Sequence, residues 1–132
     1  MAKGYDKHQE RQQAIQDLGR ALARRARSTC ELCERSGLPL HVREVSPPPE
    51  VPDIDHAVMV CETCGDAIDG GALSPPDAYR FLEGVVWSDL PVVQVCAVRL
   101  LRRVADGGAA WAGDTLEGLY LEPDILQWTD GD

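Results

Sequence analysis

Apolar residues recur at helical spacing near the start of the chain. Between residues 6 and 27, Ile15, Leu18 and Leu22 return every three or four positions, with alanines adding small apolar surface. This period predicts an amphipathic helix, and its narrow apolar stripe is typical of a surface helix that rests on a larger body. The other faces are polar and charged, so residues 1–28 are predicted to form a basic N-terminal helix.

Two short strands are predicted next, on either side of a proline-rich loop. Leu38–Val45 follows Gly37, which permits a turn, and Ala57–Val60 lies beyond the loop. Residues 46–55 contain four prolines, which cannot donate to a strand ladder and therefore predict an extended loop. Gly65 is predicted to supply a left-handed turn after the second strand.

The second half of the chain is predicted to be helical. Ser74 stands before two prolines, which marks a helix start and predicts a helix through about Val86. Ser88 or Asp89 is predicted to cap a second helix that ends at Gly107. Its apolar residues cover more than one face, so it is the expected central helix of the core. Two shorter helices are predicted to follow, at residues 110–119 and 123–128.

Two cysteine pairs carry the clearest chemical signal. Cys30-Glu-Leu-Cys33 and Cys61-Glu-Thr-Cys64 each place two residues between the thiols, and 27 residues separate the pairs. The two-residue gap lets one tight turn aim both sulfurs at the same point, and a tetrahedral cation accepts four thiolates. The pattern predicts one structural Zn²⁺ with four ligands and no others: Cys30, Cys33, Cys61 and Cys64. Such a site has no open position for water or substrate.

Redox chemistry and disulfide bonding fit these cysteines less well. A thioredoxin-like site uses a single Cys-x-x-Cys within a βαβ pattern, which the predicted elements lack. A disulfide framework is typical of secreted proteins, and no secretory signal segment precedes the first pair. No apolar run approaches the roughly 18 residues of a membrane helix. Reduced, metal-bound cysteines in a cytoplasm are therefore expected, with no membrane partner.

Charge is divided unevenly along the chain. Residues 1–43 hold nine Lys or Arg against five Asp or Glu, whereas residues 44–132 hold four against seventeen. The acidic part argues against DNA wrapping across the whole surface. Only the N-terminal helix could contact a polyanion, or the acidic face of another copy, through four arginines: Arg20, Arg24, Arg25 and Arg27. A protein partner or self-association is open, nucleic acid is open but not favoured, and a solvated basic face is the simplest interpretation.

Together with the cysteine pairs, further motifs make the chain resemble the long form of the PhnA family, proteins named for an alkylphosphonate-utilisation operon. These motifs keep their order over roughly residues 28–128: Trp87-Ser88, Pro91-Val92-Val93-Gln94-Val95, Arg99-Leu100-Leu101, Trp111-Ala112, Leu119-Tyr120-Leu121, Leu126 and Trp128. The resemblance implies a zinc-ribbon-like module followed by a helical segment. It implies no mechanism, because the operon name records gene neighbourhood. Long-form relatives continue into a small β-barrel-like domain. The residues of this chain are not expected to bind the ligand of that domain.

A weaker resemblance links the first cysteine pair and the following strand to HNH nucleases. Such nucleases need a histidine general base at the end of the first strand and a second histidine beside the later cysteine pair. Glu44 and Gly65 occupy these positions here. His41 lies on the other side of the strand, and His56 lies in the proline loop. Because general-base geometry must be met first, this alternative predicts a degenerate nucleic-acid-binding module and not an active nuclease.

Five other residues have simple structural interpretations. Cys96 lies in the apolar central helix and is expected to be a buried, inert thiol. Trp87, Trp111 and Trp128 are expected to pack in the core or between helices. Gln94 stands among apolar neighbours near a helix start, where it is expected to hydrogen-bond a loop carbonyl or to mark a pocket.

The sequence thus predicts an α+β protein. A small four-cysteine zinc ribbon or treble clef at residues 29–72 is flanked by the N-terminal helix and by a helical region at residues 73–132, packed as one compact unit. The favoured function is a non-catalytic, PhnA-like binding or regulatory module. The alternatives are the degenerate HNH-derived module and an accessory protein or enzyme of phosphonate metabolism. Phosphonate hydrolysis calls for open metal positions with oxygen or histidine ligands, whereas the predicted site is closed.

Overall fold

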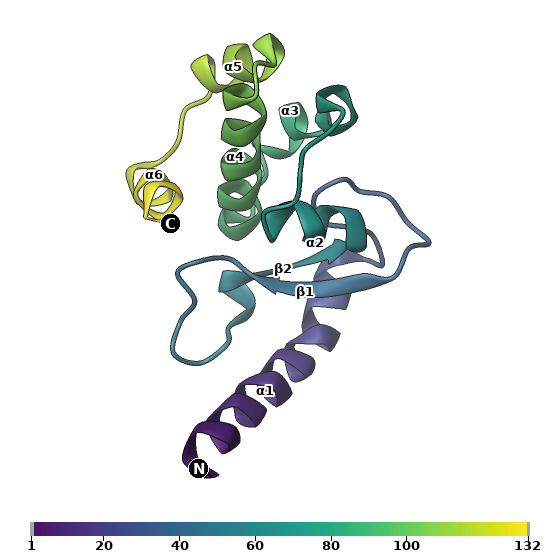
Figure 1. Cartoon of the computed structure of the whole chain (residues 1–132), viewed down its shortest axis with the longest axis vertical. Coiled ribbons are helices and arrows are strands. Elements are labelled where there is room, and N and C mark those ends of the chain that lie inside the picture. Colours follow the sequence, from purple (N-terminus) through teal and green to yellow (C-terminus); the bar gives the residue numbers. More distant parts are fainter. Residues whose placement is uncertain (1, 132) are drawn as a thin grey trace.

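The computed structural model describes residues 2–131, with side chains from residue 6 onward. Its helices and strands follow in this order: α1 (Ala2–Ala26), β1 (Leu40–Glu44), η1 (Ile54–His56), β2 (Ala57–Cys61), α2 (Glu62–Ile68), η2 (Pro76–Tyr79), α3 (Leu82–Val85), α4 (Pro91–Asp106), α5 (Ala110–Glu117) and α6 (Pro123–Asp130). In Figure 1, α1 projects at one end, the strands cross the middle, and α4 and α5 extend to the other end. This is the mixed helix and small-sheet fold that the sequence predicts. No helix in the described part is long and apolar enough to cross a membrane.

The two strands form an antiparallel pair, and β2 is buried on both of its faces. The register places these residues opposite one another: Leu40 and Cys61, Val42 and Met59, Glu44 and Ala57. Because side chains alternate along a strand, Ala57 and Met59 pack against α1, whereas Val58 and Val60 join the core formed with the C-terminal helices. β2 therefore lies between the N-terminal helix and the rest of the protein.

The central helix of the larger core is α4, as predicted. Its first residue is a proline and a glycine follows its last, so its ends are the predicted ones within a residue or two. Nine of its side chains are buried: Val92, Val93, Val95, Cys96, Ala97, Val98, Leu100, Leu101 and Val104. Both cysteine pairs contribute to the same core, together with residues of α3, α5 and α6. The cysteine-rich segment and the helical region are thus packed around one helix.

Arginines from α4 satisfy the carbonyl groups at two other helix ends. Arg99 donates to the Trp128 and Thr129 carbonyls at the end of α6, at 2.6 and 3.2 Å. Arg103 donates to the Ala67 carbonyl near the end of α2, at 2.5 Å. Helix C-terminal carbonyls lack intrahelical partners and carry partial negative charge. These bonds therefore fix α2 and α6 to the central helix.

Several sequence-based boundaries are wrong. The helix predicted from Ser74 to Val86 is split into η2 and α3, because hydrogen bonds from the amides of residues 78 and 80 to carbonyls three residues earlier wind the chain as a tighter turn. Leu90, and not Ser88 or Asp89, is the N-cap residue of α4. The Ser88 hydroxyl instead accepts the Leu90 amide at 3.1 Å.

The left-handed turn expected at Gly65 is also absent, because this glycine lies inside α2. The residue after α2 with a positive φ is Gly70, at +105°. Gly65 has another role, which is to make room for a neighbouring side chain. A Cβ atom there would lie 3.2 Å from the guanidinium of Arg43, which pairs with Asp69 at 3.1 Å.

Candidate metal centre

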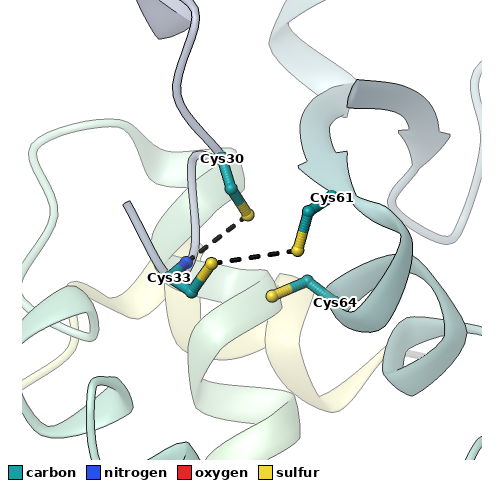
Figure 2. A group of neighbouring side chains, drawn as sticks. All are labelled: Cys30, Cys33, Cys61 and Cys64. Atoms are coloured by element: carbon teal, nitrogen blue, oxygen red, sulfur yellow. Dashed lines mark hydrogen bonds between the residues drawn. The ribbon is translucent and has the colours of Figure 1, made fainter. Parts of the chain in front are cut away.

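The four paired cysteines converge on one point between the first loop and the start of α2 (Figure 2). All four sulfur atoms lie within 4.8 Å of one another, and the Cys33 and Cys61 sulfurs are 3.8 Å apart. A tetrahedron with metal–sulfur bonds of about 2.3 Å has edges of about 3.8 Å. All five cysteines of the chain are free thiols. The arrangement therefore fits a zinc ion bound by four thiolates.

Residues 30–33, here called the first knuckle, are shaped by backbone hydrogen bonds. The Cys30 amide donates to the Arg35 carbonyl at 3.0 Å, and the Glu34 amide donates to the Cys30 carbonyl at 2.9 Å. The Cys33 amide points at the Cys30 sulfur, 3.5 Å away. These bonds turn the chain back on itself, so both thiols face the same point.

Residues 61–64, the second knuckle, use regular secondary structure instead. Cys61 is the last residue of β2 and the N-cap residue of α2, and Cys64 follows within the first turn of that helix. Cys30, Cys61 and Cys64 are buried, whereas Cys33 is half-buried. The strand and the helix therefore hold two ligands rigidly.

The residue that follows the first knuckle has an unfavourable backbone conformation. Glu34 has φ of +64°, in the left-handed region that favours glycine, and its side chain is exposed. Glu34→Gly is expected to raise the free energy of unfolding by about 0.5 kcal/mol, because relief of strain outweighs the extra entropy of the unfolded chain. Denaturant unfolding of the zinc-loaded protein measures this difference. Ser36→Gly is the control and should lower stability, since Ser36 has no positive φ.

Without a metal, the thiols would differ in pKa. The hydrogen bond from Cys64 lowers the pKa of Cys30 below its usual range. That bond and burial raise the pKa of Cys64, and burial raises the pKa of Cys61. A cation bound to four thiolates replaces these protons, so metal binding is expected to release protons.

Two arginines lie beside the cysteines. The Arg35 Nε donates to the Cys33 sulfur at 3.4 Å, and this bond is the main reason that the pKa of Arg35 is raised. Arg25 binds both carboxylate oxygens of Glu31, each at 2.8 Å. Glu31 stands between the ligands of the first knuckle, so its ion pair ties α1 to the metal-binding loop. No spacing rule in the sequence could identify either contact.

Glu31 also covers the outer edge of β2. Its amide donates to the Met59 carbonyl at 2.9 Å, and its carboxylate accepts the Met59 amide at 2.8 Å. Arg25 adds bonds to the carbonyls of Ile54 and Ala57, both at 2.8 Å. One buried carboxylate thus joins the first knuckle, the second strand and the N-terminal helix.

The positions suggested by the HNH resemblance hold structural contacts. Glu44 binds Arg11 of α1, with Oε1 2.6 Å from the guanidinium, and Gly65 lies under Arg43. His41 is exposed. The ring of His56 packs on Trp128, with centroids 5.1 Å apart. The structure therefore does not bring these residues together as a hydrolytic site.

The predictions for Cys96, Gln94 and the three tryptophans have different outcomes. Cys96 is buried, and burial raises its pKa to about 12. The side-chain Nε2 of Gln94 donates to the Val86 carbonyl at 2.8 Å, as expected. Trp111 and Trp128 are half-buried, and their indole groups donate to Asp77 and to the Ser46 carbonyl. Trp87 is 54% exposed, so its predicted role in packing is wrong.

The four arginines of the basic helix divide into two groups. Arg25 is half-buried in its ion pair with Glu31 and is not free for a partner. The other three are exposed: Arg20, Arg24 and Arg27.

Comparisons of the chain with protein-family models, with curated proteins and with solved structures give no match. The site is therefore interpreted from its own geometry and chemistry.

Proposed function

We propose that this chain is a non-catalytic binding module whose fold is stabilised by one zinc ion. Cys30, Cys33, Cys61 and Cys64 would hold the ion. The single observation that carries the proposal is the convergence of their four sulfurs within 4.8 Å. Bound zinc would supply structural cross-linking and no reaction step, because four protein thiolates leave no coordination position for a substrate.

The order of elements supports a treble-clef-like assignment for this module. One knuckle lies in a loop, two antiparallel strands follow, and the second knuckle opens a helix. The PhnA-like motifs support the same proposal, since they imply a cysteine-rich module followed by helices. The exposed arginines of the basic helix, together with the closed metal site proposed here, support a binding or regulatory role.

The test is the metal content of the purified native chain. We expect one zinc per chain, and X-ray absorption should fit four sulfur ligands at about 2.3 Å. Nitrogen or oxygen ligands in the fit, or less than stoichiometric metal after growth in zinc-supplemented medium, would contradict the proposal. Cys96→Ser is the matched control, because it removes a thiol outside the cluster and should leave the zinc content unchanged.

The nuclease alternative has a separate test. With Mg²⁺ or Mn²⁺ added, the zinc-loaded protein is expected to leave plasmid DNA uncut, because Glu44 and Gly65 are held in structural contacts. Metal-dependent cutting that disappears in Glu44→Ala or His41→Ala would reverse this assignment.

A further inference from the structure

The outward surface of α1 carries a row of unpaired arginines. Arg20 and Arg24 are four residues apart and so share one helix face, and Arg27 follows the helix end. All three side chains are exposed. Within residues 6–131, the arginine ion pairs involve other residues: Arg11, Arg25, Arg43, Arg80 and Arg102. The sequence from residue 18 to residue 30 contains no Asp or Glu, so this row, here called the arginine row, has no acidic neighbour along the helix. At its end, Arg27 lines a surface hollow with Glu34 and Asp89, without an ion pair to either.

The opposite charge is concentrated at the other end of the chain. After Arg103 the sequence contains no Lys or Arg. Four exposed carboxylates lie on α5, on α6 and between them: Asp114, Glu117, Glu122 and Asp124. The same segment holds two exposed apolar side chains, Tyr120 at 68% and Leu126 at 41%. We call this surface the acidic end.

Within residues 6–131, no ion pair joins these two surfaces. In Figure 1, the end of α1 that carries the row lies near the strands in the middle of the molecule, whereas α5 lies at the upper end and α6 lies to the left. Charges separated by more than about 8–10 Å are largely screened at physiological salt. Each surface is therefore without an ion-pair partner among the described residues of its own chain, and a second chain supplies both complements.

We propose that two copies of this chain associate antiparallel about a twofold axis, with the arginine row of each copy on the acidic end of the other. A twofold interface uses the same pair of surfaces twice and closes on itself. Exposed ion pairs contribute little individually, so the dimer is weak and sensitive to salt. Tyr120 and Leu126 add the apolar contact that such an interface requires, since tyrosine and arginine are enriched in interfaces.

Nucleic acid is the less favoured partner. With Arg25 held by Glu31, only the three arginines of the row are left among the four of the basic helix to contact phosphates. Residues 44–132 hold seventeen acidic residues against four basic ones, which would repel a polyanion. A second copy supplies carboxylates for the arginine row and arginines for some of these acidic residues.

Sedimentation velocity of the zinc-loaded full chain tests the dimer. We expect a dimer at about 0.05 M salt and a monomer at about 1 M salt, where the screening length falls to about 3 Å. An arginine-reversed variant (Arg20→Glu, Arg24→Glu, Arg27→Glu) should weaken association at least about tenfold. An acid-reversed variant (Asp114→Lys, Glu117→Lys, Glu122→Lys, Asp124→Lys) should do the same. An equimolar mixture of the two variants should recover the dimer, because its charges are again complementary.

Single variants give a matched control. Arg24→Glu should weaken the dimer, whereas Lys7→Glu should not, because Lys7 is exposed on a different face of the same helix. The substituted positions are on the surface, so circular dichroism and zinc content should be unchanged. A monomer at low salt, or a mixture that stays monomeric, overturns the inference and leaves the zinc proposal intact. If the native chain binds an oligonucleotide and the arginine-reversed variant does not, the row is a nucleic-acid-binding surface instead.

Discussion

Zinc removal is expected to unfold most of this protein and not only the segment between the knuckles. Zinc binding in small zinc-finger peptides contributes about 10–16 kcal/mol at neutral pH, whereas a whole domain is stable by about 5–15 kcal/mol. The cysteines Cys30, Cys61 and Cys64 belong to the core that surrounds α4. Loss of the ion therefore removes support from the C-terminal helices as well as from the strands.

Hydrogen exchange with and without a chelator measures this effect. Amides of β1, β2 and α2 should lose their protection fully, and those of α4 should lose most of it. Cys61→Ser should reproduce the result without a chelator. Cys96→Ser is the matched control: it buries a hydroxyl at a cost of about 1–3 kcal/mol and should still bind zinc. Protection that survives in β2 of the metal-free protein would contradict the prediction.

Glu31→Ala should lower the free energy of unfolding by about 3–5 kcal/mol, because removing one member of a buried ion pair leaves the other charge unpaired. The side chains of Glu31 and Arg25 are only 5% and 16% exposed. The substitution also leaves the Met59 amide without its acceptor. Chemical denaturation of the zinc-loaded protein measures the loss.

A double-mutant cycle separates the ion pair from the other bonds. Arg25→Ala combined with Glu31→Ala should cost less than the sum of the two single losses, since the second removal leaves no new unpaired charge. Glu34→Ala is the control, because this nearby carboxylate is exposed and should change stability by less than about 0.5 kcal/mol. If the two losses in unfolding free energy are strictly additive, the interaction between Arg25 and Glu31 does not itself contribute to stability.

The sequence was sufficient to predict the features that depend on a local pattern of residues. Helical periodicity predicted α1, the apolar residues around position 96 predicted the central helix, and the spacing of the cysteines predicted which thiols meet. Short elements were predicted less well. The split between η2 and α3 depends on backbone hydrogen bonds that no composition rule specifies. Gly65 lies inside α2, and the side chain that packs against it, Arg43, is distant in the sequence.

Contacts between distant segments could not be predicted at all. Arg25 was one of four arginines with equal claims to a surface role, and only folding places it against Glu31. Trp87 was expected in the core because tryptophan is usually largely buried, yet it is the one tryptophan of three that stays mostly exposed. Such outcomes depend on tertiary packing, which a single sequence does not display.

If zinc binds as proposed, the position of Glu31 couples the docking of the N-terminal helix to the binding of the ion. This residue lies between two metal ligands and at the same time holds α1 through Arg25. Any ligand or neighbouring molecule that favours the docked helix must therefore raise the affinity for the ion, and the ion must raise the affinity for that molecule by the same factor. The concentration of free zinc would then change how tightly α1 docks on the rest of the protein, although the ion does not contact the outer face of the helix.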